Sequence, residues 1–250
     1  MTRDHNLEFQ DNEERQYSYE FDHIVREFLL RRLEPEMRRG GEVLELGAYL
    51  GDMTSQLLDF FGHVDVVEGS EVLADHVRAR FPGKVTVTAG LLEHVEPGRL
   101  YDNIFLVHTL EHLDEPVEVL ARIRSWLTAE GRLFVAVPNA NALSRQIAVH
   151  MGLISHNSAV TPGEFDHGHR RTYSLDTVLA DVRAAGLHVV DFGGVIVQPL
   201  ANFQFDRALN EGIVSPEFVS ACDSLAMVLP DLSSSVFVTC ARAPETLPGN

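Results

Sequence analysis

The stretch Glu45-Leu46-Gly47-Ala48-Tyr49-Leu50-Gly51 joins a short apolar run at 42–46 to a helical stretch at 54–61. Glycine at positions 47 and 51 permits a tight turn and a close approach of the backbone to a ligand. The dinucleotide fingerprint G-x-G-x-x-G is absent, because Tyr49 occupies its middle position and Thr54 its last. The stretch therefore predicts a ligand-binding turn between a strand and a helix, and it weighs against a nicotinamide or flavin enzyme.

Short apolar runs alternate with helical stretches along the rest of the chain, which predicts a parallel sheet with helices on both faces. The carboxyl ends of parallel strands meet at one edge of the sheet, where ligands bind. Strands are expected at 42–46, 63–68, 84–88, 103–107, 132–137, 187–197 and 235–241, and helices at 18–33, 54–61, 71–81, 117–127 and 174–185.

The composition describes an ordinary globular chain of 250 residues, 45% hydrophobic and 23% charged. With 37 acidic and 20 basic side chains the net charge is −17, which disfavours nucleic acid and anionic membranes as partners. No apolar run is long enough to span a bilayer, and the polar N-terminus lacks the order of a signal peptide. Two cysteines support no disulfide framework. We expect one cytoplasmic domain over 1–250, with a mobile tail at 1–17.

Glu68 ends the second predicted strand, 21 residues after Gly47. An acid at the end of this strand can accept hydrogen bonds from both hydroxyls of a ribose. A solvated strand-end acid is the alternative. The pairing of a glycine loop with an acid at this spacing favours the ligand role.

Together with the loop at 45–51 and Glu68, the stretch His108-Thr109-Leu110-Glu111-His112-Leu113-Asp114-Glu115-Pro116 resembles class I S-adenosylmethionine-dependent methyltransferases. The similarity is to the branch that acts on small molecules, the ubiquinone-type and sugar methyltransferases, and it covers residues 40–197. It implies a Rossmann-like sheet of seven strands, mostly parallel, in which the last strand is antiparallel. One position departs from the family, which usually has glycine where Tyr49 stands.

The resemblance implies S-adenosylmethionine as the cofactor. Glu45 would lie beneath its methionine part, Glu68 would hold the ribose hydroxyls, and His108 would sit beside the sulfonium. Gly90 and Leu91 would flank the adenine, where the family often has an aspartate. The implied cofactor-binding residues are Glu45, Gly47, Tyr49, Gly51, Glu68, Gly90, Leu91 and His108.

Two long connections, 139–173 and 198–234, lie on the ligand edge in the family's topology. Each is long enough to be a lid over the acceptor rather than a turn. Within the second connection, helices are expected at 202–210 and 216–228.

A dense polar cluster at 165–173 predicts acceptor recognition, with Arg170 or Arg171 pairing an anionic group. Anchoring of the loop is the alternative for the cluster, and packing of the lid on the body is the alternative for Phe203. The candidate acceptor-binding residues are His169, Arg170, Arg171, Tyr173 and Phe203.

Methyl transfer from a sulfonium requires alignment of the acceptor and often removal of one proton, a task that suits a neutral histidine. His112, directly after the fourth strand, is predicted as this base, and His167 is the runner-up. His108 and His112, with His167 or His169, have a spacing that a metal site could use. The acidic ligand pattern of metal-dependent sugar methyltransferases is not evident, so no metal is predicted.

The sequence thus predicts transfer of a methyl group to an oxygen or nitrogen of a small molecule, in natural-product or sugar biosynthesis. A non-catalytic S-adenosylmethionine-binding or regulatory protein with the same fold is the alternative, and Tyr49 is its support. An NAD-dependent oxidoreductase is disfavoured by the missing fingerprint. The acceptor and the oligomeric state, a homodimer included, stay open.

Overall fold

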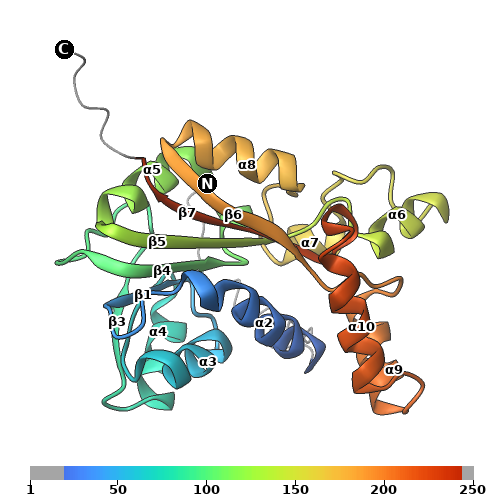
Figure 1. The fold of residues 1–250 in the computed structure, drawn as a ribbon, viewed down its shortest axis with the longest axis horizontal. Coiled ribbons are helices and arrows are strands. Elements are labelled where there is room, and N and C mark those ends of the chain that lie inside the picture. The colour runs from blue at the N-terminus through green and yellow to red at the C-terminus, as the bar shows by residue number, and fades with distance from the viewer. Residues whose placement is uncertain (1–19, 244–250) are drawn as a thin grey trace.

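One sheet of seven strands forms the centre of the protein in a computed structural model, which describes residues 20–243 (Figure 1). The strand order is β3-β2-β1-β4-β5-β7-β6; β7 runs antiparallel to both of its neighbours, and the other pairs are parallel. This confirms the predicted fold class, including the antiparallel last strand. The strands are β1 Val43–Leu46, β2 Val64–Glu68, β3 Val85–Ala89, β4 Tyr101–Val107, β5 Leu127–Pro138, β6 Leu187–Val195 and β7 Ser235–Arg242.

Helices cover both faces of the sheet, and each face has its own apolar cluster. One cluster includes side chains of α5 and α8, and the other includes side chains of α2, α3, α9 and α10. Figure 1 shows α5 and α8 on one side of the sheet and α2 and α3 on the other. The helices are α2 Glu20–Leu33, α3 Asp52–Phe61, α4 Glu71–Arg80, α5 Pro116–Trp126, α6 Leu143–His150, α7 Pro162–Asp166, α8 Leu175–Ala184, α9 Asn202–Asn210 and α10 Pro216–Ala226.

Local sequence signals set several of these boundaries. The Ser174 hydroxyl accepts from the backbone N–H of Thr177 at the start of α8, as its predicted role of N-cap requires. Gly186, with φ of 74°, follows the end of the same helix in the left-handed region. All residues of β1 and β2 are buried, which is why these strands consist mainly of valine and leucine, with Glu45, Asp65 and Glu68 as buried acids among them.

Several strand boundaries differ from the sequence prediction by one or more residues, and the backbone explains two of these differences. β5 begins at Leu127 rather than at residue 132, because the backbone turns extended directly after α5 and Leu127 pairs with Tyr101 of β4. The polar residues between Leu127 and the apolar run hide this early start. β6 ends at Val195 rather than at residue 197, because Ile196 takes a positive φ of 53° and leaves the sheet.

Both long connections lie at the carboxyl end of the parallel strands, where Figure 1 shows α6 and α7 near α9 and α10. The second connection contains the two predicted helices, α9 and α10, and α10 ends at Ala226. The tail predicted at 1–17 lies outside the described residues. None of the helices described between residues 20 and 243 combines the length and apolar character needed to cross a membrane.

Candidate active site

A cavity of about 410 Å³ lies at the carboxyl edge of the sheet. Its walls come from α2, the loop after β1, the start of α3, the ends of β4 and β5, and both long connections. The volume falls in the range of pockets that hold small molecules and cofactors. The cavity therefore joins the glycine loop to the segments predicted as lids.

The loop after β1 has a backbone that suits close approach to a ligand. Gly47 has φ of 81°, and a Cβ at this position would lie 2.5 Å from the Thr109 Oγ1, so only glycine fits. Tyr49 takes the left-handed conformation with φ of 51°, and His108 at the end of β4 has the same φ. For residues other than glycine this conformation costs about 1–2 kcal/mol. Both strained residues line the cavity, as is common at functional sites.

Glu68 holds this loop in place from the end of β2. Its Oε2 accepts from the backbone N–H groups of Ala48 and Tyr49, both at 3.0 Å, and its Oε1 accepts from the N–H of Ser70 at 3.0 Å. Burial raises the pKa of Glu68, and these hydrogen bonds oppose the rise. The carboxylate thus offsets the backbone strain at Tyr49.

Glu45 lies beneath the loop, buried and only partly satisfied. Thr54 donates to its Oε2 at 2.6 Å, and its Oε1 has no hydrogen-bond partner within residues 20–243. Burial raises the pKa of Glu45 to about 8, the Thr54 hydrogen bond opposes this, and the neighbouring Glu68 adds to it. Glu45 is therefore neutral near pH 7 in the ligand-free protein.

Arg26 of α2 brings a positive charge to the cavity wall. Its Nη1 is buried and has no hydrogen-bond partner in the described part of the chain. Loss of solvation is the main cause that lowers the pKa of His108 to about 3, and the charge of Arg26 acts in the same direction. The imidazole is therefore neutral, and its Nε2 lies 3.1 Å from the Ser235 hydroxyl, within hydrogen-bond distance.

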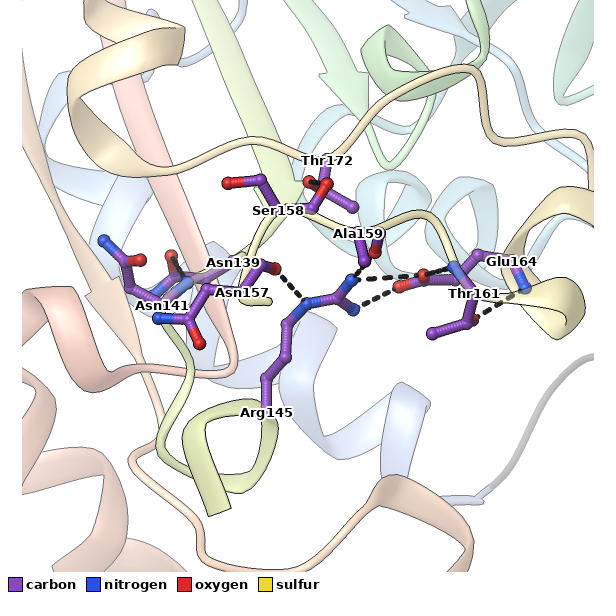
Figure 2. A network of polar contacts seen from close by, with 9 residues as sticks. All are labelled: Asn139, Asn141, Arg145, Asn157, Ser158, Ala159, Thr161, Glu164 and Thr172. Carbon is purple, nitrogen blue, oxygen red and sulfur yellow. Dashed lines mark hydrogen bonds and ion pairs between the residues drawn. The ribbon is translucent and has the colours of Figure 1, made fainter. Parts of the chain in front are cut away.

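Arg145 organises the first long connection, and Figure 2 shows the network that it forms. Its guanidinium pairs with Glu164 of α7 at 2.6 Å and donates to the carbonyls of Asn157 and Ala159. Burial disfavours ionised Glu164, but hydrogen bonds from Arg145 and Thr161 outweigh it and hold the pKa of Glu164 below its usual range. Arg145 and Glu164 both line the cavity, so this ion pair fixes one of its walls.

Asn139 ties the two long connections together. Its side-chain amide donates to the carbonyls of Asp231 and Ser233, both at 2.8 Å. Its Oδ1 accepts from the N–H of Asn141, and Figure 2 includes both asparagines. The first connection is thereby attached to the segment that precedes β7.

Three of the predicted cofactor residues, Gly47, Tyr49 and His108, line the cavity. Gly51 precedes α3 with φ of 84°, and Glu45 and Glu68 stand behind the loop as described above. Gly90 and Leu91 follow β3 away from this cavity, and Gly90 donates its N–H to the Glu68 carbonyl at 2.9 Å. The ribose and adenine roles of Glu68, Gly90 and Leu91 stay predictions.

Of the histidines predicted to act on the acceptor, His167 and His169 line the cavity and His112 does not. The His112 ring instead meets the His169 ring edge-on, with centroids 4.7 Å apart.

The remaining predicted acceptor residues make contacts within the protein, as the anchoring alternative expects. Arg170 pairs with Asp114 at 3.2 Å, and Arg171 donates to the carbonyls of Leu113 and Asp114. Tyr173 is buried and donates to Asp181 at 2.8 Å. Phe203 is 55% exposed. None of the four lines the cavity, and their acceptor roles stay predictions.

Sequence reasoning missed Arg26, Glu111 and Arg145 as cavity residues. Glu111 is 1% exposed, and neither of its carboxylate oxygens has a hydrogen-bond partner among the described residues. Burial raises the pKa of Glu111 to about 8. It stands inside the stretch that carried the family resemblance, but Arg26 and Arg145 lie on helices whose sequence gives no sign that they face the same cavity.

Comparison with known proteins supports this architecture. A family model described as a methyltransferase domain matches residues 13–191. No curated protein matches the sequence. Among solved structures, the N-methyltransferase NodS of Bradyrhizobium japonicum in complex with S-adenosyl-L-homocysteine superposes with a TM-score of 0.59 at 13% identity, over 95% of this chain and 99% of that one. The CcbJ methyltransferase of Streptomyces caelestis gives 0.58 at 18% identity, over 88% and 90%.

The chain therefore belongs to this methyltransferase-domain family, because the family model covers well over half of its length. At such low identities the two structural matches speak for the fold alone. The match confirms the prediction, made from the loop at 45–51, Glu68 and the stretch at 108–116, of a class I S-adenosylmethionine-dependent methyltransferase.

The raised pKa of Glu45 makes the stability of the ligand-free protein depend on pH. Between pH 4.5 and 8 the folded state keeps the Glu45 proton that the unfolded state releases, so the free energy of unfolding falls as pH rises. The slope from this one group is at most about 1.4 kcal/mol per pH unit. Urea unfolding of Glu45→Gln at pH 5, 6, 7 and 8 should lack this contribution, because glutamine still accepts from Thr54 and carries no proton.

Glu118→Gln, an exposed position on α5, is the matched control and should keep the parent's slope. Identical slopes for the parent and Glu45→Gln would mean that Glu45 is ionised in the folded protein.

The Arg145 network predicts which segment loosens when it is removed. Arg145→Met keeps most of the apolar stem but loses the pairing with Glu164 and the bonds to two carbonyls. Charge-assisted hydrogen bonds contribute about 1.5–3 kcal/mol, so amides of α6 and α7 should exchange about 10–100-fold faster. Hydrogen-exchange mass spectrometry measures this, with Arg183→Met on the exposed side of α8 as the control. Unchanged exchange in α6 and α7 would show that the ion pair does not hold the segment.

Proposed function

We propose that the protein transfers a methyl group from S-adenosylmethionine to an oxygen or nitrogen of a small molecule bound in the cavity. The observation that carries this proposal is the cavity itself, which joins the glycine loop after β1 to both long connections. Membership of the methyltransferase-domain family supports the reaction, and the cavity volume of about 410 Å³ supports a small acceptor.

The charged groups around the glycine loop fit the cofactor. S-adenosylmethionine has a carboxylate, an ammonium group and a sulfonium, and it supplies an electrophilic methyl group when bound. Arg26, with its unpartnered Nη1, would pair with the carboxylate, and Glu45, with its unpartnered Oε1, would accept from the ammonium group. Glu68 would accept from the ribose hydroxyls with carboxylate oxygens that also accept from backbone N–H groups of the loop.

The strained Tyr49 is compatible with catalysis. It adopts the left-handed conformation that glycine takes freely, and the cavity beside it stays open. This removes the main support for a non-catalytic protein, since the side chain at position 49 does not close the pocket.

The connections 139–173 and 198–234 would cover the acceptor and exclude water. His167 follows α7 in the first of them and lines the cavity, so it would take the acceptor's proton. His112, the first choice from the sequence, does not line the cavity, and its ring contacts the ring of His169 edge-on. Whether the acceptor atom is oxygen or nitrogen, and whether the chain forms a homodimer, stay predictions.

The role of Arg26 is tested by cofactor binding. Arg26→Gln removes the charge that would pair with the methionine carboxylate, so calorimetry should give about 10–100-fold weaker binding of S-adenosylmethionine, the loss expected for a charge-assisted hydrogen bond. Arg207→Gln, at an exposed position of α9 paired with Glu211, is the control and should bind like the parent. Equal affinity of Arg26→Gln and the parent would place the carboxylate elsewhere.

The role of His167 is tested by separating binding from turnover. The acceptor is first found by screening amines and alcohols with labelled cofactor. His167→Ala should lower the rate of methyl transfer to this acceptor by about 10²–10⁴-fold and should leave cofactor affinity unchanged. His112→Ala is measured in parallel. If both variants fold and turn over within a few-fold of the parent, the enzyme acts by positioning and uses neither histidine as a base.

A further inference from the structure

Glu111, His112 and His169 bring three potential metal ligands together at the inner wall of the cavity. One ligand atom from each side chain lies within 4.8 Å of the others. Glu111 and His169 also line the cavity, so the group faces the place where the acceptor would bind. Two imidazoles and one carboxylate form a donor set that catalytic zinc sites and other first-row divalent metal sites use.

Glu111 is the observation that points to a bound cation. Its side chain is 1% exposed, and both carboxylate oxygens lack a hydrogen-bond partner among the described residues. A buried carboxylate without partners is costly, and buried charges in proteins are paired or coordinate metals. The 3₁₀ turn Leu110–His112, directly after β4, places Glu111 and His112 side by side in the chain.

The backbone holds the third ligand against the first two. The N–H of Arg170 donates to the carbonyl of Glu111 at 2.9 Å, and the N–H of His169 donates to the carbonyl of Glu164 at 2.9 Å. The segment that carries His169 is therefore fixed both to the Glu111 turn and to α7. Zinc bound at about 2.0–2.1 Å in a tetrahedral site separates its ligands by about 3.4 Å, so small side-chain rotations would close the set.

We propose that Glu111, His112 and His169 bind one first-row divalent cation, Zn²⁺ by its donor set, with an open position toward the cavity. The three ligands leave that position for a hydroxyl oxygen of the acceptor, whose proton becomes more acidic on the metal and would pass to His167. The oxygen then forms its bond to the methyl carbon as the bond from that carbon to the cofactor sulfur breaks, which leaves S-adenosylhomocysteine. This part rests on the proposed methyl transfer and narrows the acceptor to a hydroxyl compound. His112 is then a ligand, which is consistent with a ring that contacts His169 and does not line the cavity.

The sequence predicted no metal because histidine spacing alone is weak evidence and no acidic pattern accompanied it. The fold shows which side chains come together: Glu111 is buried beside His112, and His169, 57 residues after His112 in the chain, lies next to both.

Metal binding is tested without cofactor or acceptor. Chelator-treated full-length protein is titrated with Zn²⁺ by calorimetry and with Co²⁺ by visible absorption. We expect one equivalent of Zn²⁺ per chain and a Co²⁺ d–d band of the intensity typical of four- or five-coordinate sites. Absence of stoichiometric binding and of the band in the parent would overturn the proposal, whatever the variants do.

Variants assign the site. Glu111→Gln and His169→Gln should each weaken Zn²⁺ binding at least tenfold and diminish the Co²⁺ band, whereas His150→Gln, an exposed histidine at the end of α6, should bind like the parent. Undiminished binding in a folded Glu111→Gln/His169→Gln double variant would overturn the assignment.

The catalytic part has its own outcome, separate from that of the proposed function. Binding of S-adenosylmethionine should survive chelation, which keeps the cofactor site independent of the metal. Transfer to a hydroxyl acceptor should fall at least tenfold on chelation and return with Zn²⁺. If chelation leaves methyl transfer unchanged, the metal does not bind the acceptor and this part of the proposal is overturned. If the untreated protein does not bind S-adenosylmethionine at all, the proposed function is contradicted instead.

Discussion

The structure of the site depends on one interaction, in which backbone N–H groups of the loop after β1 donate hydrogen bonds to the Glu68 carboxylate. It joins the ends of the adjacent strands β1 and β2 and holds Tyr49 in a conformation that the residue would otherwise avoid. Because the loop is fixed in this way, Gly47 packs against Thr109, which follows β4, and three strand ends form one rigid floor beneath the cavity. The two long connections and their side chains are placed relative to this floor.

The floor is also electrostatically unusual, since it buries several acids beneath a cavity whose wall carries the basic groups Arg26 and Arg145. Glu45, Glu68 and Glu111 all have raised pKa values with burial as the leading cause, and the charge of Arg26 opposes the rise at Glu45. In the ligand-free protein these carboxyls are stabilised by protonation or by backbone N–H groups. A cation in the cavity would favour their ionised forms. The site is thus prepared for a positively charged cofactor, and at Glu111 for a metal ion.

The sequence predicted the sheet well because its strands are short buried runs bounded by clear helix signals, such as the Ser174 cap and Gly186. It predicted the glycine loop from spacing within one strand–loop–helix unit. It could not place Arg26 or Arg145, because their approach to the cavity depends on how α2 and α6 pack in three dimensions. For Arg171 and Tyr173 the sequence predicted contact with the acceptor, whereas both side chains form hydrogen bonds within the protein. A polar cluster that anchors a loop has the same composition as one that binds a ligand, so the sequence could not separate the two roles.

The central claim is that the buried acids beneath the loop receive the positive charge of the cofactor. Calorimetric titration with S-adenosylmethionine at pH 7, in buffers that differ in ionisation enthalpy, counts the protons exchanged on binding. Because Glu45 is protonated in the free protein and would ionise beside a cation, the parent should release more protons than Glu45→Gln. An equal proton count for the two proteins, with both binding the cofactor, would contradict the account.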